Sequence, residues 1–168
     1  NMGGVFHVRR ENKGDMARLA RILTGNAVSL VLSGGGARGF AHLGVLRALE
    51  ELHVPIDMVG GTSMGAPIAG LVAQGSSGTE AGIRSSEAYH KIIDFTLPLV
   101  SLIAGKRISD SIKKQTGDWD IEDFWLPFFC VSTSLTTALP MVHRRGNSWL
   151  AIRSSVSIPG VLPPMPHN

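Results

Sequence analysis

The chain has 168 residues, of which 43% are hydrophobic and 17% charged, a balance typical of one globular domain with its own core. The net charge is +3, and the basic residues are scattered, which favours a solvated basic face over a nucleic-acid surface. The single cysteine, Cys130, excludes an internal disulfide. No secretory signal or bilayer-spanning apolar run is present. We expect an intracellular protein, cytoplasmic or membrane-associated through parts outside this chain.

The first third of the chain predicts a short arm followed by a helix and a strand. Residues 1–14 are polar and contain glycines, which indicates a linker or arm, and the domain is expected over residues 15–168. Asp15 is expected to cap a helix that ends at Gly25. Its apolar positions recur at helical spacing and are Met16, Leu19, Ile22 and Leu23. The apolar run Ala27–Leu32 predicts a buried parallel strand.

Two further helices and a strand follow within a short distance. A helix is expected over Phe40–Leu52, with Leu43, Leu46 and Leu49 in the core. Pro55 leads into a short strand, Ile56–Val59, and the small apolar residues Ala66–Ala73 predict a helix. This alternation of strands and helices is typical of an α/β sheet with right-handed crossovers.

The middle of the chain is less regular. Glycines and serines in Gly75–Gly82 predict an exposed loop, and Ile83–Phe95 is weakly helical. The proline-interrupted run Leu97–Ile103 fits either a lid or a buried connection. Ile108–Gln115 predicts a short helix.

The last third predicts one more sheet strand and an irregular end. Phe124–Ser134 is aromatic and β-branched, which favours a strand. Residues 138–152 indicate a hairpin or a passage from strand to helix. Four prolines in Ser154–Pro166 exclude regular structure there.

One pentapeptide predicts a nucleophile. Gly61-Thr62-Ser63-Met64-Gly65 matches the G-x-S-x-G elbow, in which a serine occupies a sharp turn between a strand and a helix. The flanking glycines, the preceding apolar strand and the following helix all fit this interpretation. At the helix N-terminus, backbone N–H groups favour a developing negative charge beside Ser63.

The glycine-rich loop before the second helix allows two interpretations. Gly34, Gly36 and Gly39 spell the G-x-G-x-x-G dinucleotide fingerprint between a strand and a helix. However, Asp57 lies too early in its strand to hold a ribose, and the absence of G-K-[ST] excludes a P-loop. We favour the alternative, in which the amides of Gly35 and Gly36 form an oxyanion hole for Ser63.

Together these motifs resemble the patatin-like phospholipase domain. The resemblance is carried by Gly34–Gly39, by Gly61–Gly65 and by Ser157–Pro164. Residues 15–39 and the block Ile121–Pro127 resemble the neuropathy target esterase and lysophospholipase branch. The implied fold is a three-layer α/β/α arrangement with a mainly parallel sheet, which we expect to be incomplete at its C-terminus.

The resemblance implies a serine hydrolase of lysophospholipid or phospholipid esters that forms an acyl-serine intermediate. Ser63 would be the nucleophile of a Ser–Asp dyad, and the amides of Gly34, Gly35 and Gly36 the oxyanion hole. Arg38 and Gly39 would order that loop, while Thr62, Met64 and the glycines Gly61 and Gly65 would form the elbow. No metal or cofactor is implied, the partner is the lipid, and peripheral membrane contact is an option.

The sequence departs from the family pattern in one respect. The family's catalytic aspartate lies in an Asp-Gly motif after the proline-rich block, and this sequence contains no Asp-Gly dipeptide. A serine is a weak nucleophile without a base. We therefore expect a partial domain that lacks its catalytic aspartate. A histidine of a classical triad would have to come from His90, His143 or His167.

Two alternatives to an active esterase stay open. The chain could be a catalytically silent fragment that binds lipid or a partner, or a nucleotide-binding α/β module.

Overall fold

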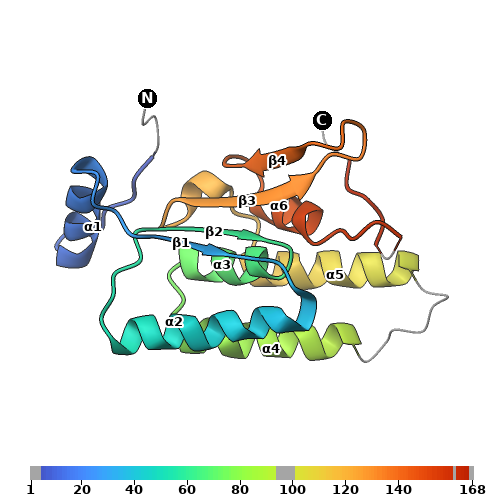
Figure 1. The fold of residues 1–168 in the computed structure, drawn as a ribbon, viewed down its shortest axis with the longest axis horizontal. Helices are drawn as coiled ribbons and strands as arrows, with labels where there is room; N and C mark the ends of the chain where they lie inside the picture. The colour runs from blue at the N-terminus through green and yellow to red at the C-terminus, as the bar shows by residue number, and fades with distance from the viewer. Residues whose placement is uncertain (1–4, 94–100, 161, 167–168) are drawn as a thin grey trace.

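The computed structural model describes residues 5–93, 101–160 and 162–166 (Figure 1). Its elements in chain order are α1 (Lys13–Leu23), β1 (Ser29–Leu32), the 3-10 helix η1 (Gly36–Phe40), α2 (Ala41–Glu51), β2 (Met58–Thr62), α3 (Gly65–Ala73), α4 (Gly78–Ile93), α5 (Ser101–Thr116), the 3-10 helix η2 (Ile121–Asp123), β3 (Phe128–Thr133), β4 (Pro140–His143) and α6 (Ser148–Ser155). The predicted α/β class is confirmed.

The four strands form one sheet in the order β1-β2-β3-β4. The first three run parallel and β4 is antiparallel to β3, so the predicted mainly parallel sheet is also confirmed. In the register, Leu32 lies opposite Gly61 and Gly61 lies opposite Cys130. The carboxyl ends of the three parallel strands therefore meet at one edge, which here is termed the carboxyl edge.

Helices α2 to α6 lie on one face of this sheet (Figure 1). The side chains that point to that face are buried, among them Leu32, Val59 and Cys130. Burial raises the pKa of the Cys130 thiol to about 12, which fits the inert core residue that its apolar surroundings predict. On the opposite face Val31 and Val142 are 63% and 50% exposed. The family resemblance implies helices on both faces of the sheet. In the described residues, helices α2 to α6 cover one face only.

Helix α1 begins earlier than predicted and buries two charged side chains besides Ile22. Its N-cap is Asn12, whose side chain accepts a hydrogen bond from the Asp15 amide, so the predicted cap at Asp15 is wrong. Asp15 is buried beneath Arg9 and Arg18, which hydrogen bond to its carboxylate. Met16 is exposed instead. Ile22, one of the predicted apolar positions, is buried as well, so ion pairing and apolar spacing together decide which face of this helix is buried.

Residues of the expected arm contact the rest of the domain. A ring nitrogen of His7 lies 2.6 Å from the carbonyl oxygen of Glu122. The guanidinium of Arg9 lies 4.9 Å from the ring centre of Trp125. The structure thus joins this segment to the region around η2.

The predicted loop Gly75–Gly82 is half helical. Helix α4 begins at Gly78, where the Ser77 hydroxyl accepts a bond from the Glu80 amide and the Glu80 carboxylate accepts one from the Ser77 amide. This reciprocal capping box overcomes the low helix propensity of the two glycines, Gly78 and Gly82. Residues 97–100 of the proline-interrupted run Leu97–Ile103 lie outside the described residues. Its last three residues belong to the start of α5, which begins at Ser101.

Other predicted elements are present with shifted ends. Strand β1 occupies only Ser29–Leu32, at the edge of the sheet rather than in its buried centre. Strand β2 begins after Ile56 and continues to Thr62. Strand β3 begins at Phe128, because η2 and an extended stretch precede it.

Candidate active site

Ser63 occupies the turn between β2 and α3. Its φ is +49°, a left-handed conformation that residues other than glycine rarely adopt. The strand ends at Thr62 and the helix begins at Gly65, so the chain reverses direction over Ser63 and Met64. This is the strand–turn–helix context that a nucleophile elbow requires.

The elbow requires glycines at both flanks because other parts of the backbone are so close. A Cβ at Gly61 would overlap the carbonyl of Gly65, and a Cβ at Gly65 would overlap the carbonyl of Leu32. The start of α3 therefore lies directly against the end of β1. Close packing of this kind brings the turn next to the glycine loop that follows β1.

The glycine loop lies against the candidate nucleophile. A Cβ built on Gly34 would be 3.0 Å from the Cβ of Ser63 and 3.7 Å from its Oγ. Gly36 has a φ of +54°, and a Cβ on Gly39 would overlap the side chain of Met64. The loop and the elbow, separate in sequence, are thus in contact.

Backbone amides of this region are available as donors. In the described part of the chain, the amides of Gly34, Gly35 and Met64 donate to no protein acceptor. The amide of Arg38 donates to the carbonyl of Gly35 at 3.1 Å, which closes the turn of the loop, while the Arg38 side chain is exposed. Sequence reasoning assigned Met64 only to the elbow, although its position after the serine is the usual place of an oxyanion donor.

Ser155, which sequence reasoning missed, also contacts the elbow. Its hydroxyl accepts a hydrogen bond from the Ser63 amide at 2.9 Å and donates one to the Val131 carbonyl at 2.6 Å. The Thr62 hydroxyl donates to the same carbonyl at 3.0 Å. Ser155 ends α6 and lies far from Ser63 in sequence, so no local motif could reveal the contact.

Asp57 lies at the wrong end of β2 to serve as the base. Its carboxylate is fully buried and accepts hydrogen bonds from the Arg21 guanidinium at 2.6 and 2.9 Å and from the Val28 amide at 2.9 Å. Burial opposes ionisation, but these donors prevail and lower the pKa of Asp57. Ser63 lies six positions further along the chain, about 20 Å away at ~3.3 Å per residue of extended strand. Its role is structural.

Two of the described histidines, His143 and His42, hydrogen bond to groups other than Ser63. The ring of His143 lies 2.7 Å from the Ser132 hydroxyl, and that of His42 lies 2.9 Å from the Ser33 carbonyl. His167 and the side chain of His90 lie outside the described residues. Within the described part, no hydrogen bond joins the Ser63 hydroxyl to a carboxylate or an imidazole, and no group of three His, Cys, Asp or Glu is arranged to hold a metal ion.

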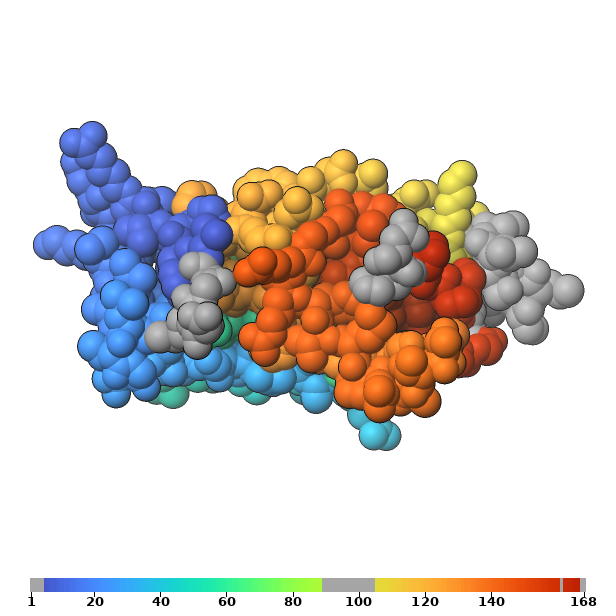
Figure 2. Space-filling model, turned by 90° about the horizontal axis from the view of Figure 1, so that it is seen from above, coloured from blue at the N-terminus to red at the C-terminus, as the bar shows by residue number. Residues whose placement is uncertain are grey.

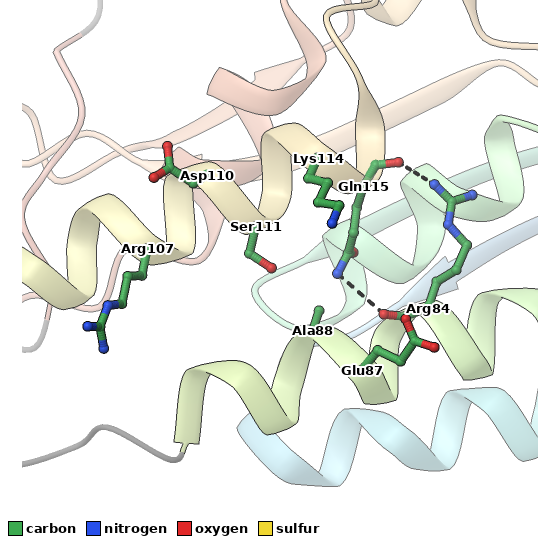
Figure 3. Close-up of a pocket in the computed structure, with 8 residues that line it drawn as sticks. All are labelled: Arg84, Glu87, Ala88, Arg107, Asp110, Ser111, Lys114 and Gln115. Carbon is green, nitrogen blue, oxygen red and sulfur yellow. Dashed lines mark hydrogen bonds between the residues drawn. The ribbon is translucent and has the colours of Figure 1, made fainter.

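A separate hollow of about 400 Å³ lies between α4 and α5 (Figure 3). The guanidinium of Arg84 donates to the carbonyl of Gln115 across it, and the Gln115 amide lies 3.4 Å from the Arg84 carbonyl. The lining residues are Arg84, Glu87, Ala88, Arg107, Asp110, Ser111, Lys114 and Gln115. None of them belongs to the elbow or to the glycine loop, so the hollow is distinct from the candidate site.

Comparison with known proteins agrees with this geometry. Residues 30–168 match the model of the patatin-like phospholipase family. The chain is 43% identical to human patatin-like phospholipase domain-containing protein 6, with 96% of this chain and 12% of that protein covered. It is also 43% identical to lysophospholipase NTE1 of Saccharomyces cerevisiae, with 94% of this chain and 10% of that protein covered. The chain thus spans about a tenth of the length of these curated relatives.

A solved structure shares the fold. ExoU of the Pseudomonas aeruginosa type III secretion system superposes with a TM-score of 0.52 at 18% identity, over 82% of this chain and 39% of ExoU. At this identity the likeness shows the fold alone. The family match covers most of the chain and includes both the glycine loop and the elbow. The chain belongs to the patatin-like phospholipase family.

Proposed function

We propose that this chain is the nucleophile-bearing part of a serine esterase that hydrolyses the acyl ester of a lysophospholipid or phospholipid. The observation that carries the proposal is the contact between Ser63, in its left-handed turn, and the glycine loop with its available amides. The names of the relatives, phospholipase and lysophospholipase, support a lipid ester as substrate.

The geometry supports a two-step reaction. The Ser63 oxygen attacks the ester carbonyl carbon while its proton passes to a base, and the carbonyl oxygen becomes an oxyanion. The amides of Gly34, Gly35 and Gly36 would bind that oxyanion together with the Met64 amide, and removal of one such donor typically costs about 10²–10³ in rate. Collapse of the intermediate expels the alcohol and leaves acyl-Ser63. Water then attacks the acyl group and releases the fatty acid and the free serine.

The base is the part of this mechanism that the described residues do not supply. The family resemblance places it on an aspartate of an Asp-Gly motif, which this sequence lacks. We therefore expect activity only from a longer protein that contains these residues together with such an aspartate. That protein is termed the parent protein below.

Peripheral contact with lipid is supported by the surface at the carboxyl edge of the sheet. The loop between β3 and β4 follows the carboxyl end of β3, and its Leu135 and Leu139 are 62% and 63% exposed. Figure 2 shows the β3–β4 region on the surface of the molecule. Exposed leucines beside the candidate site suit a substrate that is packed in a membrane or micelle. No helix of the described residues is long and apolar enough to cross a bilayer.

The experiment is release of fatty acid from lysophosphatidylcholine by the parent protein. Ser63→Ala should reduce the rate at least a thousandfold, since the nucleophile is lost, a change of about 4 kcal/mol in activation free energy. The control is Ser154→Ala in α6, which removes a hydroxyl that bonds to the Leu150 carbonyl of its own helix. This variant should release fatty acid at the unmodified rate. Activity retained by Ser63→Ala contradicts the proposal.

A second candidate function follows from the lack of a bonded base. In the described residues no carboxylate meets the Ser63 hydroxyl, which favours a lipid-binding role for the 168-residue chain taken by itself. Saturable binding of lysophosphatidylcholine without release of fatty acid would support this role. Fatty-acid release by the isolated chain would exclude it.

A further inference from the structure

The Ser155 hydroxyl connects three separate parts of the fold. It accepts a hydrogen bond from the Ser63 amide and donates one to the Val131 carbonyl, so its proton and one lone pair are both engaged. Ser155 belongs to α6, Ser63 to the turn after β2, and Val131 to β3. One side chain thereby joins the candidate nucleophile to a helix and to the neighbouring strand.

The hydroxyl lies where the hydrogen-bond ladder between β2 and β3 is interrupted. In this parallel pair the Val59 amide donates to the Pro127 carbonyl at 3.0 Å. Parallel ladders repeat every second residue. The same bond four positions later on each strand would join the Ser63 amide to the Val131 carbonyl. The turn at Ser63 breaks this pattern, and Ser155 binds both the donor and the acceptor that the ladder would have paired.

Thr62, the last residue of β2, contacts the same carbonyl group of Val131. Its hydroxyl donates to the Val131 carbonyl, which therefore accepts hydrogen bonds from two side chains, those of Thr62 and Ser155. A left-handed conformation at a serine persists only where its surroundings impose it. Here the Ser155 hydroxyl bonds directly to the backbone amide of Ser63, the residue with the left-handed conformation.

We propose that Ser155 is a positioning residue, which holds the Ser63 backbone so that its hydroxyl faces the amides of the glycine loop. Without the Ser155 hydroxyl, the Ser63 amide either closes directly on the Val131 carbonyl or turns to water. Both changes move the Ser63 oxygen relative to Gly34. A displacement of about 1 Å at a reacting centre can cost about a hundredfold in rate. The catalytic consequence rests on the proposed function, whereas the hydrogen bond does not.

Three variants test this role. Ser155→Ala removes the hydroxyl, and Ser155→Thr retains it. Ser154→Ala is the matched control, because among the described residues the Ser154 hydroxyl bonds only to the Leu150 carbonyl of its own helix, at 2.9 Å. The first readout is amide hydrogen exchange at Ser63, measured by NMR on the 168-residue chain. The second is fluorophosphonate labelling of Ser63 in the parent protein, resolved into reagent affinity and maximal rate.

We expect the Ser63 amide to be protected in the unmodified chain. Ser155→Ala should speed its exchange by about twofold to tenfold, with α3 amides unchanged, as loss of one hydrogen bond implies. The maximal labelling rate should fall about tenfold to a hundredfold at unchanged reagent affinity. Ser155→Thr should restore both readouts, and Ser154→Ala should alter neither.

Several results would overturn the proposal. An unprotected Ser63 amide in the unmodified chain, or equal exchange in Ser155→Ala, would show that the bond does not hold the turn. Faster exchange with unchanged labelling would remove the positioning role. Absence of labelling in every protein, with faster exchange in Ser155→Ala, would contradict the proposed esterase and the positioning role of Ser155, although the backbone bond would be established.

Discussion

At the scale of single residues, the site depends on backbone conformation as much as on side-chain chemistry. Ser63 has a φ of +49°, where a side chain is disfavoured, and its amide is bonded to Ser155. Such outliers in non-glycine residues cost on the order of 1–3 kcal/mol and gather at functional sites. The conformation at Ser63 therefore stabilises the arrangement of the site at the expense of the fold.

This conformational cost predicts which of two substitutions of Ser63 gives the more stable protein. Ser63→Gly and Ser63→Ala both remove the hydroxyl, but glycine adopts positive φ without strain. We expect the free energy of unfolding of Ser63→Gly to exceed that of Ser63→Ala by about 1 kcal/mol. Urea denaturation of both variants measures the difference. Equal stabilities, or a more stable alanine variant, would show that the turn is not strained.

Sequence reasoning found the elbow and the glycine loop because both are local patterns. Gly61 and Gly65 flank the serine, and the structure supplies the reason, since a side chain at either would overlap the backbone. Ser155 was not predicted because it bonds to Ser63 across 92 positions. The catalytic assignments of Ser63 and of the glycine-loop amides stay predictions until activity is measured.

At the scale of elements, the contact of α3 with β1 sets the geometry of the candidate site. Gly65 begins α3 directly against the Leu32 carbonyl at the end of β1. The same contact places the loop after β1 beside the turn before α3. Elements with strong local signals, such as α3 and the strand before it, were predicted with small shifts of their ends. The start of α4 lies earlier than predicted because the Ser77–Glu80 capping box stabilises a helical turn in spite of its glycines.

Substitutions of two glycines test this packing. Gly65→Ala should lower the free energy of unfolding by roughly 1–3 kcal/mol, because the new methyl group overlaps the Leu32 carbonyl. The control is Gly44→Ala within α2, where a Cβ meets no atom within 4 Å. There alanine should raise stability by roughly 0.5–1 kcal/mol through helix propensity. A Gly65→Ala variant as stable as Gly44→Ala would contradict the close contact at the start of α3.

At the scale of the whole molecule, two buried carboxylates pair with arginines: Asp15 within the N-terminal region, and Asp57 between that region and the start of β2. Asp15 accepts hydrogen bonds from Arg9 and Arg18, and Asp57 accepts them from Arg21 and the Val28 amide. Hydrogen bonds from Arg9 hold the pKa of Asp15 well below its usual range. The pKa of Asp57 is lowered as well, although burial opposes this. Sequence periodicity cannot reveal such pairs, because they replace apolar contacts at buried positions.

These pairs predict acid sensitivity. Groups with a lowered folded pKa stabilise the fold above their unfolded pKa of about 4, and this stabilisation is lost as pH falls through and below that value. The free energy of unfolding should thus be nearly constant from about pH 6 to 8 and decrease below about pH 5. Asp57→Asn should be less stable at neutral pH and show a shallower decrease in acid. The test is denaturant titration at several pH values. If the free energy of unfolding of Asp57→Asn falls with decreasing pH as steeply as that of the unmodified chain, this account is contradicted.

The measurement that tests the central claim most directly is mass-spectrometric mapping of a fluorophosphonate adduct on the parent protein. The account predicts a covalent adduct on the peptide that contains Ser63. It also predicts loss of this adduct in Ser63→Ala and after heat denaturation, since reactivity depends on the folded turn. Hydrolysis of lipid ester by a protein whose Ser63 stays unlabelled, or labelling of a different serine in the native protein, would contradict the assignment of Ser63 as the nucleophile.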